Sequence, residues 1–202
     1  MHSQPAGLKV EQFLPSVTLV SRPLPGGYGF SVAAALVRGT RHRVVVDTLI
    51  QPADMAPFTG ATLVVYTHAD WDHCWGTGAF PGVPVIAHHL TRVRLKAPEA
   101  LAELEKTRAD EPANFAGSQV IPPDLTFYDR FTIDAGGLTV DLHHLPGHTA
   151  DSAVAHVPEL ELLLAGDAVE TPLPTLSEAG LIRSWASALR RWSRAGLKHV
   201  VP

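Results

Sequence analysis

A buried strand that runs into a cluster of histidine and aspartate residues constrains this chain more than any other segment. Residues 63–73 read LVVYTHADWDH, and their second half holds four potential metal ligands: His68, Asp70, Asp72 and His73. In an extended loop, residues two apart point to the same side, so His68 and Asp70 can share one metal ion. If the chain then turns, Asp72 and His73 face a second ion. Imidazole and carboxylate ligands in this pattern suit zinc, iron or manganese.

Two further segments repeat this arrangement, because each carries an apolar strand followed by a polar residue. His148 follows a Pro-Gly turn after the apolar stretch 138–145, and Asp167 follows the stretch 161–165. Functional sites in sheet proteins collect at one end of the strands. Three strands that end in such loops therefore predict one convergent site.

The rest of the sequence predicts one domain over residues 1–202, since no low-complexity tract or linker divides it. Short β-branched runs between turn residues predict strands. These strands cover 17–20, 31–37, 43–47, 62–67, 83–87, 138–145, 153–157 and 161–165. Apolar spacings of three and four predict helices over 98–109 and 181–192, the second ended by Gly196. This order favours two β/α halves, with the sheets packed together and the helices outside.

Composition excludes several classes of protein. Sixteen lysine and arginine residues against twenty acidic ones give a formal charge of −4, so we expect no nucleic-acid partner. The single cysteine, Cys74, cannot form an internal disulfide, and the N-terminal residues do not resemble a secretory leader. No run approaches the ~20 apolar residues of a membrane span. We therefore expect a cytoplasmic protein without a membrane partner, acting on a small-molecule substrate; its oligomeric state is not predicted.

Taken together, the motifs resemble those of the metallo-β-lactamase fold superfamily of metallohydrolases. The matching pieces, in family order, are Val46-Asp47-Thr48, His68-Ala69-Asp70-Trp71-Asp72-His73, Pro146-Gly147-His148-Thr149 and Ala165-Gly166-Asp167. The resemblance implies an α+β fold, a four-layer αββα sandwich with two divalent metal ions between the edges of its sheets. By the same resemblance, His68, Asp70 and His148 hold the first metal, Asp72 and His73 the second, Asp167 bridges them, and Asp47 lies beneath the site.

One departure from the family pattern concerns the metal. Asp70 stands where the family usually has histidine, which resembles carboxylate variants such as the flavodiiron proteins. Two divalent ions carry four positive charges, and the carboxylates of Asp70, Asp72 and Asp167 remove three of them. The additional carboxylate weakens the metals as Lewis acids and tilts the preference towards iron or manganese. Zinc nevertheless remains the first expectation.

A second departure lies at the end of the sequence. Family members usually carry a last histidine for the second metal in a Pro-Gly-His context, and Lys198-His199-Val200-Val201-Pro202 stops where it would follow. We expect either that the sequence stops short of the end of its domain or that the second site is weakened. His199 is expected to precede the last strand, at a strand edge, and not to bind metal.

The resemblance implies a hydrolase in which a metal-bound hydroxide attacks a small ester, thioester, lactone or related substrate. Asp72 or Asp167 would orient the hydroxide as the catalytic residues. Two alternatives stay open. Asp70 favours a non-haem iron protein acting on oxygen or sulfur species, and the missing histidine favours a single-metal binding protein without catalysis.

Other polar residues are assigned structural roles. Cys74 is expected to be a small apolar residue at a helix start and not a nucleophile. His88 and His89 are expected to begin a helix, and neither His143 nor His144 is expected to bind metal. The glycine-rich segment 26–30 does not fit a phosphate loop, because it precedes a strand; it favours a flap in which Tyr28 and Phe30 touch the substrate.

Overall fold

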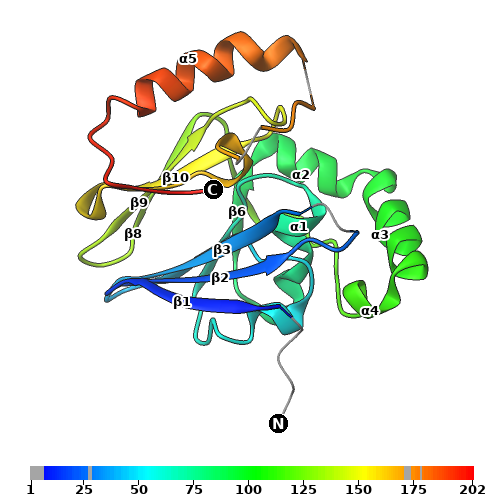
Figure 1. Ribbon diagram of the computed structural model, residues 1–202. Coiled ribbons are helices and arrows are strands. Elements are labelled where there is room, and N and C mark those ends of the chain that lie inside the picture. The colour runs from blue at the N-terminus through cyan, green and yellow to red at the C-terminus, as the bar shows by residue number, and fades with distance from the viewer. Residues whose placement is uncertain (1–6, 27–28, 171–173, 178) are drawn as a thin grey trace.

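The computed structural model of the protein describes residues 7–26, 29–170, 174–177 and 179–202 (Figure 1). Its strands form two sheets, of seven and five strands. The first sheet has the order β1-β2-β3-β4-β5-β6-β7. Its strands are β1 (Lys9–Leu14), β2 (Val17–Pro23), β3 (Ser31–Arg38), β4 (Arg43–Val46), β5 (Leu63–Val65), β6 (Val85–His88) and β7 (Leu125–Phe127). Strands β1 to β4 pair antiparallel, and β4 to β7 pair parallel.

The second sheet has the order β12-β11-β10-β9-β8. Its strands are β8 (Arg130–Asp134), β9 (Thr139–His144), β10 (Ala153–Val157), β11 (Leu162–Leu164) and β12 (His199–Val201). Strand β12 runs parallel to β11, and the other pairs are antiparallel. His199 is thus the first residue of β12 and does not precede it, because the amides of Lys198 and His199 already bond to the Glu161 carbonyl.

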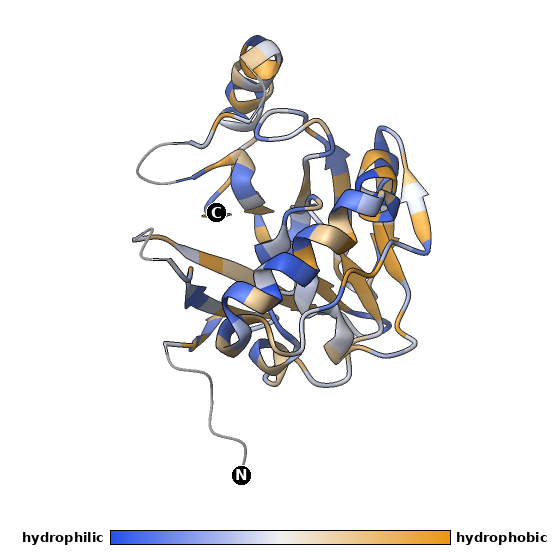
Figure 2. Cartoon of the chain, turned by 90° about the vertical axis from the view of Figure 1, so that its right-hand side faces the viewer, coloured by the Kyte–Doolittle hydropathy of each residue, from blue (hydrophilic) through white to orange (hydrophobic). Residues whose placement is uncertain are grey.

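Helices cover the outer face of each sheet, as Figure 1 shows. On the first sheet lie α1 (Trp71–Cys74), α2 (His89–Lys96), α3 (Pro98–Asp110) and α4 (Pro112–Phe115). On the second lies α5 (Ile182–Trp192). In Figure 2, seen from the side of these first helices, the strands are mostly hydrophobic and the helices in front carry many hydrophilic residues. No described helix is both long enough and apolar enough to cross a membrane.

Successive side chains along the strands point to opposite faces of each sheet, and this alternation produces the four layers. In β3, Ala35 and Val37 join the core between the sheets, whereas Ala34 and Leu36 join the core beneath the helices. On β11, Leu162 and Leu164 face the other sheet, and Leu163 faces α5. Both faces of these strands are buried, which explains their continuous apolar sequences. The predicted αββα sandwich is confirmed.

The predicted elements are present, with boundaries shifted by a few residues, and others are added. Strands β1, β7 and β8 were not predicted. Strand β1 is mostly exposed, and β7 has only three residues, so neither leaves a strong apolar pattern. The predicted helix start at 88–89 is confirmed, since His88 is the N-cap of α2.

Candidate metal centre

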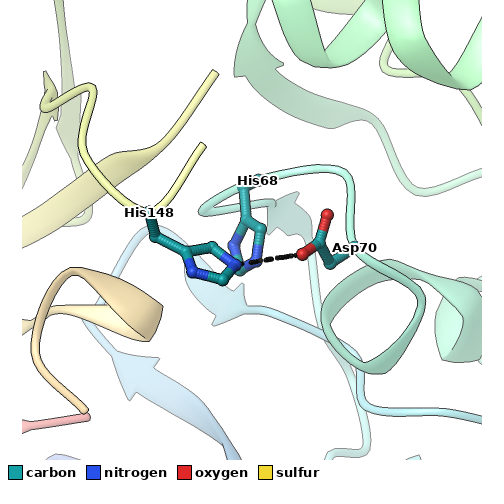
Figure 3. Close-up of side chains that lie close together, drawn as sticks. All are labelled: His68, Asp70 and His148. Carbon is teal, nitrogen blue, oxygen red and sulfur yellow. Dashed lines mark hydrogen bonds and ion pairs between the residues drawn. The ribbon is translucent and has the colours of Figure 1, made fainter. Parts of the chain in front are cut away.

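Three loops bring histidines and aspartates together at one edge of the sandwich. His68 and Asp70 follow β5, His148 follows the turn after β9, and Asp167 lies in a 3₁₀ turn after β11. His68, Asp70 and His148 each place a ligand atom within 4.8 Å of the others (Figure 3). The same separation holds for His68, His73 and Asp167. The structure thus brings five of the predicted ligands into one cluster.

Each histidine of the cluster uses its Nδ1 atom to bond to the protein. His148 Nδ1 donates to the carbonyl of Thr175 at 3.0 Å, and His73 Nδ1 donates to Asp47 Oδ2 at 2.8 Å. His68 Nδ1 lies 3.0 Å from the Thr67 hydroxyl. These bonds leave every Nε2 turned towards the centre, which is the arrangement found for metal-binding histidines.

The donor atoms fit a divalent cation. The Nε2 atom of His68 is buried without a hydrogen-bond partner among the described residues, a costly state unless a cation takes its lone pair. Asp70 Oδ2 lies 3.1 Å from His148 Nε2 and 3.4 Å from His68 Nε2. On the other side, Asp167 Oδ1 lies 2.9 Å from His73 Nε2. Imidazole nitrogens and carboxylate oxygens thus form two adjoining groups that share His68.

The charged groups of the cluster shift one another's pKa values. Burial opposes ionisation of Asp70, but His68, His148 and Arg94 outweigh it and hold the pKa of this carboxyl well below its usual range. Burial likewise opposes ionisation of Asp167, but the neighbouring His73 outweighs it, so the pKa of Asp167 lies below its usual range. Burial disfavours the cation of His148, yet Asp70 and Asp167 raise its pKa to about 9. Asp70 and Asp167 are thus ionised near neutral pH, as metal binding requires, whereas His148 must release a proton when a metal binds.

Asp72 stands at the margin of the cluster. Its Oδ2 lies 3.7 Å from His73 Nε2, and its side chain lines the adjoining cavity. Burial raises the pKa of Asp72, and the charge of Asp167 acts in the same direction. Asp72 is thus less tightly surrounded by donor groups than the other five.

Asp47 lies beneath the cluster, as the resemblance implied. Its Oδ1 accepts from the Thr67 amide at 2.7 Å, and its Oδ2 accepts from the Thr67 hydroxyl at 2.7 Å as well as from His73. Because the Thr67 hydroxyl donates to Asp47, its oxygen accepts from His68 Nδ1. Asp47 has a φ of 61°, a left-handed conformation that aspartate tolerates better than most residues. One buried carboxylate therefore orients two imidazoles.

Two residues that were not predicted hold the same loop: Arg94 of helix α2 and Asp151 of the turn after β9. Arg94 donates to Asp70 Oδ1 at 2.6 Å and to Asp151 Oδ1 at 2.5 Å. Asp151 also accepts from the Ala69 amide and the Thr91 hydroxyl, both at 2.9 Å. No motif or periodicity marks these positions, because their roles depend on contacts between residues far apart in the chain. The one available signal was that Asp151 is three residues from His148.

A cavity of about 300 Å³ opens beside the cluster. Its lining includes the polar residues Asp72, His73, Asp167 and Glu170 and the apolar residues Leu24, Phe30, Val32 and Ala33 of the β2–β3 hairpin. Phe30 thus lies where the flap hypothesis places it, whereas Tyr28 lies outside the described residues. The cavity can hold a molecule with an apolar part next to a reactive polar group.

The remaining candidates have structural contacts. The Cys74 thiol donates to the carbonyls of Ala69 and Asp70, and burial raises its pKa well above the usual range. His144 stacks on His88 with ring centroids 3.7 Å apart, and His143 packs against Trp192.

Two sheets packed face to face, helices on both outer faces and a histidine and aspartate cluster at one edge define a four-layer α+β protein with a candidate metal centre. The family model described as the metallo-beta-lactamase superfamily matches residues 27–196. The chain therefore belongs to the metallo-beta-lactamase superfamily, as its motifs predicted.

Solved structures agree with this fold. A metallo-beta-lactamase family protein from Thermus thermophilus superposes with a TM-score of 0.71 at 21% identity, covering 93% of this chain and 73% of that one. A metallo-beta-lactamase from Pontibacter korlensis superposes with a TM-score of 0.70 at 23% identity, covering 96% and 90%. At these identities the likeness shows the fold alone.

Curated relatives carry the name acyl-coenzyme A thioesterase MBLAC2. The bovine protein (Bos taurus) is 27% identical over 160 residues, and the human protein (Homo sapiens) is 26% identical over the same length. Each alignment covers 66% of this chain and 57% of the relative. The chain thus spans little more than half the length of these relatives.

Proposed function

We propose that this protein is a metal-dependent hydrolase of small thioesters or related esters. The observation that carries the proposal is the set of three imidazole Nε2 atoms and their facing carboxylates, beside a cavity with an apolar wall. Membership of the superfamily supports hydrolysis, and the name of the bovine and human relatives favours a thioester over an oxygen ester or lactone.

In this proposal two divalent ions, zinc in the first place, are held as the resemblance implies. His68, Asp70 and His148 would hold the first ion, and Asp72 and His73 the second. Asp167 would join the two, since its oxygens lie near both groups, at 2.9 Å from His73 Nε2 and 3.5 Å from His148 Nε2. When bound, such ions supply a nucleophilic water at neutral pH and polarise the substrate carbonyl.

The protein's own residues bind and orient the substrate. Leu24 and Phe30 would contact its apolar acyl part, because they line the same cavity as Asp72 and His73. Asp72 would accept a hydrogen bond from the attacking water and so aim it at the carbonyl, since its carboxylate lies in the cavity beside His73. The buried pairs around His68, His73 and His148 keep the imidazoles in place during turnover.

The test is elemental analysis of metal per chain, followed by hydrolysis of short- and long-chain acyl-coenzyme A thioesters, p-nitrophenyl acetate and γ-butyrolactone. We expect close to two zinc ions per chain and the fastest turnover on a thioester. The Asp167→Ala variant should lose metal and reduce hydrolysis on the order of 100-fold or more. Asp110→Ala, which removes an exposed carboxylate at the end of α3, is the matched control and should change neither.

Other outcomes would replace the proposal. Bound iron with no hydrolysis would favour the non-haem iron alternative. One ion per chain with no turnover of any probe would favour a binding protein. A variant without Asp167 that kept its full metal content would contradict the assignment of the centre.

A further inference from the structure

We propose that Arg94, anchored by Asp151, is the positioning residue that holds the ligand Asp70 with only one carboxylate oxygen turned towards the metal centre. This inference rests on the proposed metal centre and not on the substrate. It concerns the position where the chain departs from the usual histidine of its superfamily.

The two oxygens of the Asp70 carboxylate face different neighbours. Its Oδ1 accepts from Arg94 Nη2 at 2.6 Å, and its Oδ2 faces the Nε2 atoms of His148 and His68 at 3.1 and 3.4 Å. A free aspartate can bind a metal through both oxygens, whereas a histidine offers one nitrogen. With Oδ1 engaged by Arg94, Asp70 also offers a single donor atom.

Asp151 fixes the position of Arg94. Asp151 is fully buried, and its Oδ1 accepts from Arg94 Nη1 at 2.5 Å. Its Oδ2 accepts from the Ala69 amide, between His68 and Asp70, and from Thr91, one turn before Arg94 on α2. The planar guanidinium of arginine can donate to both carboxylates at once, which the single ammonium of lysine does less well. Arg94 therefore links α2 to the loop that carries two ligands and to the segment just after His148.

The contact with Arg94 also changes the charge balance at the centre. Counted with the ligands alone, the additional carboxylate of Asp70 favours iron or manganese. Arg94 places a positive charge 2.6 Å from this carboxylate, while the charge of Asp151 is shared among Ala69, Thr91 and Arg94. Asp70 thus acts on the metal as a weaker, one-point donor that resembles histidine, and the preference returns towards zinc.

The test measures metal binding directly, so it needs no substrate and is independent of whether thioesters are hydrolysed. Affinities for Zn²⁺ and Mn²⁺ are measured by chelator competition, and the Co²⁺ form is compared by its visible absorption spectrum. In Arg94→Met, Asp70 becomes free to bind through both oxygens. We expect the ratio of Zn²⁺ to Mn²⁺ affinity to fall about 10- to 100-fold, and the Co²⁺ bands to weaken as the coordination number rises.

Two further variants separate positioning from charge. Arg94→Lys keeps the positive charge but cannot hold Asp70 and Asp151 in the same way. If Arg94 acts by positioning, the ratio of Zn²⁺ to Mn²⁺ affinity should fall about as far as in Arg94→Met. Arg92→Met changes a neighbouring arginine of α2 that takes no part in these ion pairs, and it should match the wild type. If Arg94→Lys behaves as the wild type, or if Arg94→Met shifts both affinities equally with an unchanged spectrum, Arg94 acts only through its charge and the proposal is overturned.

A double-mutant cycle covers the case in which Arg94→Met folds poorly. Asp70→His replaces the carboxylate, and Arg94 then has no ligand to position. Adding Arg94→Lys to this background should leave the metal preference unchanged, whereas it should alter the preference in the wild-type background. Equal effects in both backgrounds would overturn the proposal.

Discussion

At the scale of single residues, Cys74 shows how burial decides chemistry. It directly follows the predicted ligand His73, yet its thiol is 1% exposed and donates to two carbonyls of the ligand loop. Burial holds its pKa well above the usual range, so the reactive thiolate is not formed near neutral pH. We expect Cys74→Ala to retain hydrolysis within about twofold, because no thiolate takes part. A large loss of turnover with an unchanged metal content would instead show a nucleophilic thiol.

The sequence predicts the candidate ligands better than it predicts the residues that hold these ligands in position. His68, Asp70 and His73 lie within one segment whose spacing is itself informative, and the structure brings them together. Arg94 and Asp151 could not be predicted, because each depends on how α2 packs against loops 24 and 57 positions away. Ligands carry local patterns, and their partners are specified by the tertiary fold.

At the scale of elements, helix α2 begins at a buried histidine. His88 is 1% exposed; its Nδ1 accepts from the Leu90 amide, and its Nε2 donates to the Tyr128 carbonyl at 2.8 Å. Burial lowers the pKa of His88 to about 4, and His144, stacked on it, acts in the same direction. The neutral ring is therefore the form that joins α2 to β6 and β7.

This histidine should make stability depend on pH. The unfolded chain takes up a proton at His88 near pH 6.5, whereas the folded chain does so only near pH 4. Between these values the unfolded state binds more protons, so stability is lost as pH falls from about 6.5 to 4. We expect His88→Gln to lower the free energy of unfolding by about 1 kcal/mol at pH 7, because the cap is disturbed. When the pH falls from 7 to 4.5, the variant should lose less of this free energy than the wild type does. Urea unfolding at both pH values tests this.

The control is His42→Gln, on the turn between β3 and β4. It should keep the pH dependence of the wild type. If His88→Gln and His42→Gln lose the same stability between pH 7 and 4.5, the titration of His88 does not explain the loss.

At the scale of the whole molecule, the outer helix α5 supports the candidate metal centre from the far side of the second sheet. Trp185 of α5 donates through Nε1 to the carbonyl of Ala168, which follows Asp167. Its indole ring also covers Gly147, which precedes His148, so closely that a Cβ there would lie 2.3 Å from Trp185 Cγ. One side chain of an outer layer thus contacts the loops that carry His148 and Asp167.

A methyl group at Gly147 should therefore disturb both the fold and the metal. We expect Gly147→Ala to lower the free energy of unfolding by about 1–3 kcal/mol through overpacking. It should also weaken metal binding, because His148 moves with its loop. Gly180→Ala is the matched control, since nothing lies within 4 Å of the added carbon. Wild-type stability and metal content in Gly147→Ala would show that α5 moves without affecting the loop.

The layered architecture was predictable because its cause is local. Runs such as Val44-Val45-Val46 have no polar side, so each strand must be covered on both faces. The edges were less predictable. Apolar and polar residues alternate only weakly along β1. Its place beside β2 depends on backbone pairing between the two strands and not on burial of its side chains.

Asp47 and Arg94 support different residues of the candidate centre. His68 and His73 share Asp47, so altering one of these imidazoles disturbs the support of the other. Within the described part of the chain, Asp70 makes no hydrogen bond to Asp47 and depends on Arg94, whose side chain is 42% exposed on a surface helix. If Asp70 binds metal as proposed, we expect paired substitutions at positions 70 and 94 to change the metal preference while the buried contacts of Asp47 stay intact.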